Sequence, residues 1–151
     1  MDNNLSQIFR NCQLYDSVSE AQIQDVQNYL GQNLPPEYQR LLQFSNGLEG
    51  CIDDQNKIYI EIWPAEKLNE ANDYYQTQDS IPGIILIGSF GKDEAIALDM
   101  RVNSQTYGYF FILPFVPFDW EEAEPLGGTI EEAMEKLKNP FNLPEEARRE
   151  K

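Results

Sequence analysis

Carboxylates are the reactive side chains that this sequence offers in quantity, and histidine is absent. The 151 residues include 26 Asp and Glu against 11 Lys and Arg, which gives a formal net charge of −15. Without an imidazole, mechanisms that need a histidine base, metal ligand or triad member are excluded. Carboxylate pairs could still bind a cation or act as acid and base. The candidates are Asp53 with Asp54, and Asp93 and Glu94 with Asp99.

The spacing of these carboxylates matches no metal-binding loop. No calcium-loop pattern is present, and acidic pairs in loops are usually solvated. The two carboxylates of a glycosidase can be distant in sequence, so spacing alone leaves that chemistry open. Weighing these observations, we predict no metal, no cofactor and no catalytic residue.

Other catalytic motifs are missing as well. The segment GSFGK at 88–92 is too short for a phosphate-binding loop, and a tight turn between strands is the better interpretation. No GxSxG motif is present. Cys12 and Cys51 form no CxxC pair and are expected to be reduced, buried thiols of an intracellular chain. The sequence therefore predicts a protein that is not an enzyme.

The acidic balance also excludes classes of partner. Nucleic acids are held largely by Lys and Arg, so this surface should repel them, and an anionic membrane face is disfavoured for the same reason. The N-terminus has no secretory signal pattern, and the apolar runs are too short to span a bilayer. We expect a cytoplasmic protein that binds neither nucleic acid nor membrane.

The negative charge is concentrated toward the end of the chain. Residues 102–135 contain no Lys or Arg. Their seven carboxylates are Asp119, Glu121, Glu122, Glu124, Glu131, Glu132 and Glu135. Such a region is either a solvated face that keeps the protein soluble or a docking surface that attracts a basic partner rapidly.

Trp120 lies among these carboxylates, in the segment FDWEEAE at 118–124. An aromatic residue flanked by acids makes a poor core segment. It is either a half-buried anchor of a loop or a binding hot spot with an acidic rim, and the sequence favours neither. Trp63 ends a predicted strand, where core packing or a cleft wall would explain it.

Three helices are predicted by caps and by apolar residues at helical spacing. Ser19 and Gln22 fit a capping box before a helix that ends at Gly31. A second helix starts at the prolines 35–36 and ends at 46–47, and a closing helix starts at Thr129, with Glu132 in the capping-box position, and runs to 138. A short helix over 66–71 is also indicated.

Four strands are predicted between the second and the closing helix. Residues 57–63 alternate in polarity, whereas 83–89 and 94–100 are largely aliphatic. Residues 107–113 are apolar on both faces apart from Gly108, which is typical of a central strand. The order of elements predicts one α+β domain over 1–151, with a mainly antiparallel sheet flanked by helices. Its core spans about 19–138, and the polar tail 143–151 is loosely held.

Several segments, in this order and spacing, resemble the SUKH superfamily, the Smi/Knr-type domain. They are LPPEY at 34–38 with LL at 41–42 and NG at 46–47, IYI at 58–60 before Trp63, IGSFG at 87–91 before EAIALD at 94–99, and the helix that begins at Thr129. The resemblance covers about 19–138. It implies an α+β fold with a sheet flanked by helices, and a binding domain rather than an enzyme.

The resemblance also implies a class of function. Bacterial members are commonly immunity proteins that neutralise polymorphic toxins, many of them nucleases, and fungal relatives regulate cell-wall synthesis through partners. Our first hypothesis is a cytoplasmic immunity protein that binds a cognate toxin, a basic one, because a nuclease needs a basic groove for phosphates. The expected contact residues are Asp119, Trp120, Glu121, Glu122 and Glu124, with Asp53 and Asp54 from the loop between the second helix and the first strand.

Two alternatives come from other classes of protein. The first is a regulatory scaffold that binds a host protein or peptide through the sheet or a cleft. The second is an enzyme or small-ligand binder that uses Trp63, Tyr59 and nearby carboxylates. A deep pocket beside Trp63 with converging carboxylates would favour the latter.

Overall fold

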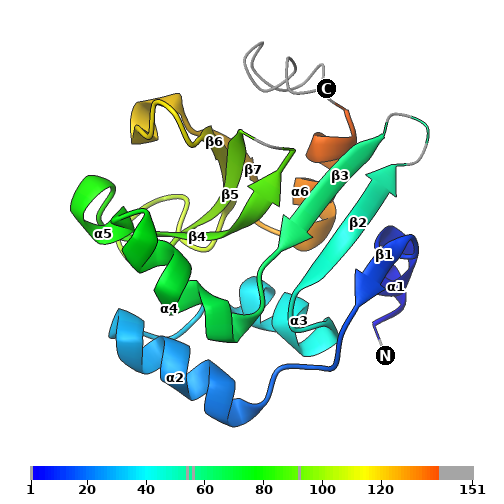
Figure 1. The fold of residues 1–151 in the computed structure, drawn as a ribbon, viewed down its shortest axis with the longest axis horizontal. Coiled ribbons are helices and arrows are strands. Elements are labelled where there is room, and N and C mark those ends of the chain that lie inside the picture. Colours follow the sequence, from blue (N-terminus) through cyan, green and yellow to red (C-terminus); the bar gives the residue numbers. More distant parts are fainter. Residues whose placement is uncertain (1, 54, 56, 92, 140–151) are drawn as a thin grey trace.

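The computed structural model describes residues 2–53, 55, 57–91 and 93–139, and Figure 1 shows how they are arranged. In this part of the chain six α-helices, a short 3-10 helix (η1) and a sheet of seven strands form one α+β domain. The predicted class, an antiparallel sheet flanked by helices, is confirmed. The elements in chain order are α1 (Asn3–Ile8), β1 (Cys12–Leu14), α2 (Glu20–Leu30), α3 (Pro36–Phe44), β2 (Leu48–Asp53), β3 (Ile58–Ile62), α4 (Ala65–Tyr74), α5 (Thr77–Ser80), β4 (Ile84–Phe90), β5 (Glu94–Asp99), β6 (Phe110–Pro114), η1 (Trp120–Glu122), β7 (Glu124–Gly127) and α6 (Ile130–Lys138).

The sheet is a meander in which every strand pairs with the next one along the chain. Its order is β1 to β7 and all six pairings are antiparallel. The sequence predicted β3 to β6 and missed β1, β2 and β7. These three strands are short or contain glycine, proline and acidic residues, so they show no apolar alternation that could identify them.

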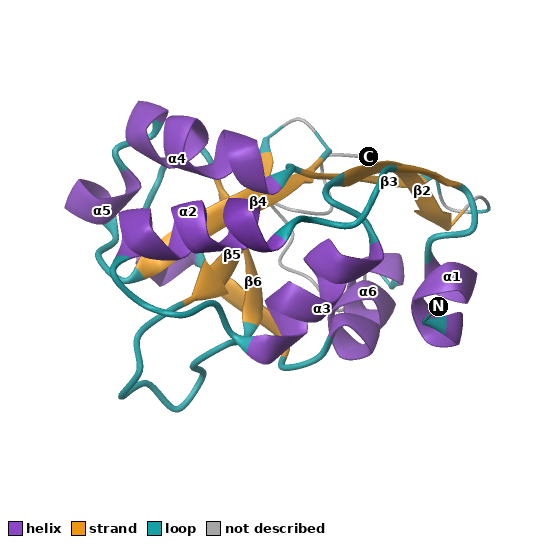
Figure 2. Cartoon of the chain, turned by 90° about the horizontal axis from the view of Figure 1, so that it is seen from below, coloured by secondary structure: helices purple, strands orange, loops and turns teal. Residues whose placement is uncertain are grey.

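The two faces of the sheet bury different sets of residues. Figure 2 shows α3 and α6 below the sheet, and the buried residues of α2 and α4 (Val26, Ala65 and Leu68) pack in the same larger core as those of α3 and α6. In β6 the alternation is complete, because Phe110 and Ile112 pack in the larger core on the α6 side while Phe111 and Leu113 pack in a smaller core on the opposite face. The strand is therefore buried on both faces, as predicted, but it lies next to the edge strand β7 and not at the centre of the sheet.

The smaller core is covered by a loop as well as by helix residues. Phe115, Phe118 and Trp120, from the connection between β6 and β7, pack on it together with Tyr75 at the end of α4. The rings of Tyr75 and Phe115 stack with their centroids 4.9 Å apart. The connection that carries most of the predicted contact residues is thus held against the sheet by its aromatic side chains.

The pairing between β3 and β4, in the interior of the sheet, is short. The two strands pair only through Ile60–Ile62 and Gly88–Phe90. Beyond that point β3 has ended, and the amide of Asn72 on α4 satisfies the free edge of β4. Its Oδ1 accepts from the Leu86 N–H at 2.8 Å and its Nδ2 donates to the Leu86 carbonyl at 3.0 Å. A buried side chain thereby replaces a strand as the hydrogen-bonding partner.

Local capping signals appear where the sequence predicted them. Ser19 accepts a hydrogen bond from the Gln22 N–H, and the Gln22 side chain accepts one from the Ser19 N–H, which completes the capping box. At α6 the Thr129 hydroxyl accepts from the Glu132 N–H, but the Glu132 carboxylate accepts from Gly128 instead of from Thr129. In this second capping box the carboxylate at position 132 therefore binds the N–H of the residue before the N-cap, and not the N–H of the N-cap itself.

Packed structure begins well before the predicted core boundary at residue 19. Leu5 and Phe9 of the first turns are fully buried in the larger core, and β1 forms the edge of the sheet. The predicted tail 143–151 lies outside the described residues.

Candidate binding surface

The predicted acidic contact residues lie on η1 and at the start of β7. Asp119 caps η1, and its Oδ1 accepts from the Glu121 N–H at 3.0 Å. Glu121 and Glu122 are exposed, whereas Glu124 is half-buried and pairs with Ile112 in the sheet. Two free carboxylates and a capping carboxylate therefore lie together on a turn that projects from the smaller core.

Trp120 is half-buried and contacts two side chains. Its ring centroid lies 4.6 Å from that of Phe111, and the guanidinium carbon of Arg101 lies 5.4 Å from the Trp120 ring. This arrangement is that of a loop anchor with a cation–π contact. Arg101 immediately precedes the stretch 102–135 without basic residues, so the sequence could not show that a cation lies beside this tryptophan.

The other two predicted contact residues, Asp53 and Asp54, belong to the segment that runs from β2 to β3. Asp53 lies at the end of β2, where its Oδ1 accepts from the Gln55 N–H, and Asp54 lies outside the described residues. In Figure 1 the end of β2 that carries Asp53 and the gold segment after β6 lie on opposite sides of the molecule. The described predicted residues therefore do not form one continuous surface.

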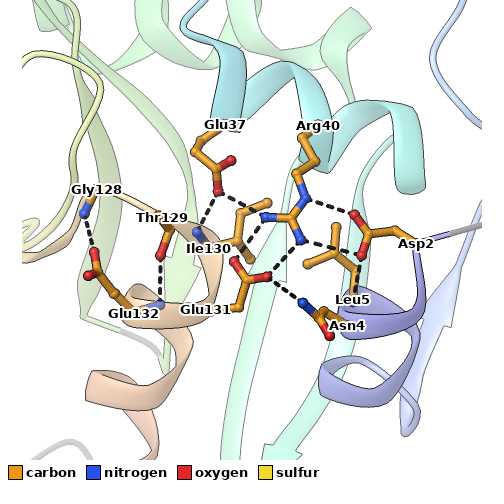
Figure 3. A network of polar contacts seen from close by, with 10 residues as sticks. All are labelled: Asp2, Asn4, Leu5, Glu37, Arg40, Gly128, Thr129, Ile130, Glu131 and Glu132. Carbon is orange, nitrogen blue, oxygen red and sulfur yellow. Dashed lines mark hydrogen bonds and ion pairs between the residues drawn. The ribbon is translucent and has the colours of Figure 1, made fainter.

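One carboxylate of the acidic stretch, that of Glu131, forms an ion pair within the molecule. Figure 3 shows the guanidinium of Arg40 on α3 between the carboxylates of Asp2, Glu37 and Glu131. Its Nε lies 2.7 Å from Asp2, and its Nη2 lies 2.7 Å from Glu131. Glu37 also accepts from the Ile130 N–H at the start of α6. The network ties α1, α3 and α6 together.

These contacts alter the acidity of the groups. The hydrogen bonds from Arg40 lower the pKa of Glu131 to about 2 and also lower the pKa of Asp2, while burial opposes both shifts. Glu131 therefore stabilises the fold through its ion pair with Arg40. The docking hypothesis applies to the carboxylates of η1 and does not include Glu131.

A groove that the sequence did not predict lies on the face of the sheet opposite α6. Its volume is about 580 Å³, and it is bounded by the segment after β1, the start of β2, the end of β3 and the start of α4. The carboxylates that line it are Asp16, Glu49, Glu61 and Glu66, and Tyr15 is the aromatic residue of its wall. None of the described residues that line it is Lys or Arg. We call it the acidic groove.

The acidic groove could not be identified from local patterns. Its four carboxylates come from four separate segments, and in the sequence each looks like an ordinary surface acid. Burial raises the pKa of the neighbouring Tyr59 phenol, and the charges of Glu49 and Glu61 act in the same direction. A negative field therefore covers this part of the sheet.

A second, more open groove of about 470 Å³ lies beside Trp63. Glu61, Glu70, Lys67 and the two tyrosines 74–75 line it. Glu61 and Pro64 border both grooves. Tyr59 does not line this groove. The groove therefore does not bring together Trp63 and Tyr59, the two aromatic residues that the small-ligand hypothesis named.

Comparison with known proteins gives the family. The model of the SMI1 / KNR4 family (SUKH-1) matches residues 17–142. The chain belongs to this family. The match covers most of the molecule, from the segment before α2 to beyond α6. SUKH-1 membership is typical of immunity proteins. No curated protein matches the chain.

The EAIALD segment of this SUKH-1 domain ends in a buried polar cluster. The Asp99 carboxylate accepts from the Arg101 backbone and guanidinium, and from the hydroxyls of Ser104 and Thr106, at 2.6–3.0 Å. Burial disfavours the charged form, but these hydrogen bonds outweigh it and lower the pKa of Asp99 to about 2. Asp99 therefore fixes the loop after β5 and holds Arg101 over Trp120.

We predict that the SUKH-1 domain loses stability in acid partly through Asp99. A carboxyl whose pKa is about 3.8 unfolded and about 2 folded stabilises the fold above pH 4, and this contribution is lost as the pH falls toward 2. Asp99→Asn should cost about 2 kcal/mol at pH 7 in urea unfolding, and much less at pH 2.5. Asp25→Asn, at an exposed position on α2, should change little at either pH. Equal deficits of Asp99→Asn at both pH values would contradict the prediction.

Among the described residues, no group of three or more His, Cys, Asp or Glu side chains could hold a metal ion. Cys12 and Cys51 are free thiols on neighbouring strands, and the Cys12 Sγ lies 3.6 Å from the Cys51 carbonyl oxygen. Burial raises the pKa of Cys12 to about 11, so it is a poor nucleophile. Within the described ranges, no helix is long and apolar enough to cross a membrane.

Proposed function

We propose that this SUKH-1 protein is a cytoplasmic immunity protein that neutralises a cognate toxin with a basic binding surface. The observation that carries the proposal is the excess of negative charge, −15 over 151 residues, on a domain whose family is typical of immunity proteins. An acidic inhibitor matches the basic surface with which a nuclease holds phosphates. It performs no chemistry of its own, because binding alone blocks the toxin.

We further propose that η1 is one of the contact surfaces. Glu121 and Glu122 are exposed next to Trp120, whose position is held by Phe111 and Arg101. A turn that is ordered before binding loses little conformational entropy on association. Exposed carboxylates there would accelerate encounter with a basic toxin more than they would strengthen the final complex.

The test measures association with the protein encoded immediately upstream of this chain, which the proposal expects to carry a toxin domain. The double reversal Glu121→Lys with Glu122→Lys should lower the association rate by about tenfold at low salt. It should also flatten the dependence of that rate on ionic strength, because fewer charges steer the encounter. Stopped-flow fluorescence at several salt concentrations gives both quantities.

A matched control separates local from overall charge. Asp25→Lys with Asp79→Lys changes the net charge equally at exposed positions on α2 and α5. It should lower the rate much less. If both double variants lower the association rate equally, the overall net charge controls this rate and the carboxylates of η1 have no local effect. If the toxin domain binds no form of the protein, the immunity proposal is wrong, and binding to a host protein instead would favour the regulatory scaffold.

A further inference from the structure

The outer face of β2 and β3 carries a pair of like charges in register. Glu49 on β2 lies directly opposite Glu61 on β3, and both line the acidic groove. The next positions across the sheet are Gln13 on β1 and Ser89 on β4, which are neutral. Like charges directly opposite one another destabilise an antiparallel pair. The row contains no cation that would offset this repulsion.

The described helices leave the outer face of β2 and β3 open beside the starts of α2 and α4, which border the acidic groove. In Figure 2 the described helices that flank β2 and β3 lie on their lower side, whereas α4 and α2 lie nearer to β4. Tyr15 and Tyr59 are 51% and 50% exposed on this outer face. Aromatic and acidic side chains are therefore available to a partner together.

Hydrogen bonds hold the Glu66 carboxylate of the acidic groove in place without neutralising its charge. The Glu66 carboxylate accepts from the amides of Asn46 at 2.8 Å and Gln22 at 3.2 Å. Asn46 is held in turn, because its Oδ1 accepts from the Ala65 N–H at 2.7 Å. Amides orient the carboxylate but leave its charge in place. None of the ion pairs among the described residues involves a carboxylate of the groove.

We infer that the acidic groove is the docking site for an arginine side chain carried by an extended segment of a basic partner protein. This deepens the proposed function, in which that partner is the toxin. A guanidinium placed between Glu49 and Glu61 would remove their repulsion and form charge-assisted hydrogen bonds with both. Arginine fits better than lysine, because its planar group can also stack on a tyrosine such as Tyr15.

The inference predicts opposite effects of one substitution on stability and on binding. Glu61→Lys replaces a like-charge pair with an opposite-charge pair, so the Tm should rise by about 2 °C. The same change places a cation where the arginine should dock, so affinity for the upstream-encoded toxin domain should fall at least about tenfold. Glu61→Gln should shift both quantities in the same directions by smaller amounts. A purely structural role of Glu61 would not produce this combination.

A defined probe tests the groove without the toxin. N-acetyl-arginine methylamide, titrated into isotopically labelled protein at millimolar concentration, should shift the backbone amides of 47–49 and 61–63 most strongly. Glu61→Gln should reduce these shifts, whereas Asp25→Asn should not. N-acetyl-lysine methylamide should shift them less. Shifts that are strongest at η1, or unchanged in Glu61→Gln, would overturn the inference.

The outcomes separate this inference from the proposed function. Toxin binding that Glu61→Lys leaves within about twofold of wild type, while the η1 reversal slows it, would disprove the groove and retain the immunity function. A lower Tm for Glu61→Lys would also disprove it, because the like charges would then not repel. Failure of the toxin domain to bind, with probe shifts still centred on the groove, would disprove the immunity function and leave the groove as a site for another basic protein.

Discussion

Replacement of Gly88 by alanine is expected to destabilise the protein by about 3 kcal/mol or to prevent folding. A Cβ on Gly88 would lie 2.1 Å from the Glu61 carbonyl oxygen and 3.0 Å from the Ile62 Cα. Both atoms belong to the backbone of β3, so they cannot move aside as a flexible side chain could. The pairing of β3 with β4 is short, and separating these strands would break the sheet between its third and fourth strands.

Gly31→Ala provides the matched control. Gly31 ends α2 with a φ of +75°, and nothing lies within 4 Å of an added Cβ. The substitution should cost about 1 kcal/mol through backbone strain alone. Urea unfolding at pH 7 measures both variants. If Gly88→Ala costs no more than Gly31→Ala, the close approach of β3 to β4 does not limit this position.

Arg40→Met is the second substitution with a large expected effect, about 3 kcal/mol at pH 7. It removes five hydrogen bonds from one guanidinium and leaves three carboxylates close together without a cation. The methionine retains much of the packing of the aliphatic stem, so the loss reports the charge and the hydrogen bonds. Thermal and urea unfolding of the variant measure it.

Two further variants test the cause of this loss. Arg40→Lys should lose more than half as much stability, because a single ammonium cannot reach Asp2, Glu37 and Glu131 with the geometry of the guanidinium. Arg10→Met should change stability by less than about 0.5 kcal/mol, since Arg10 is exposed and bonds only to the Gln7 carbonyl among described residues. Equal losses for Arg40→Lys and Arg10→Met would show that the network contributes little.

Charged residues have two roles in this molecule: some stabilise the fold through ion pairs, and others are available to a binding partner. Arg40 joins three carboxylates and Arg101 pairs with Asp99, and both arginines hold elements in place. The carboxylates of η1 and of the acidic groove have no arginine partner among the described residues and remain available to a basic protein. Partner-binding variants should therefore be made at these two surfaces, and stability variants at Arg40 and Asp99.

Local patterns in the sequence predicted the elements that have a strong local cause. The capping residues Ser19 and Thr129 mark the starts of α2 and α6 because a side-chain oxygen satisfies a helix N–H within one turn. The alternation of β3 and the apolar runs of β4 to β6 are equally local. β1, β2 and β7 depend instead on pairing with a neighbour, so nothing in their own residues identifies them.

The sequence by itself determined the net charge, the absence of imidazole chemistry, the class of fold and the family. Only the tertiary structure decided which carboxylates are free. Glu131 looks like a surface acid in the sequence, yet it pairs with Arg40, a residue 91 positions away. Glu49 and Glu61 become a like-charge pair only through the register of β2 and β3. A carboxylate's charge is a property of its residue type, whereas its partners are set by long-range packing.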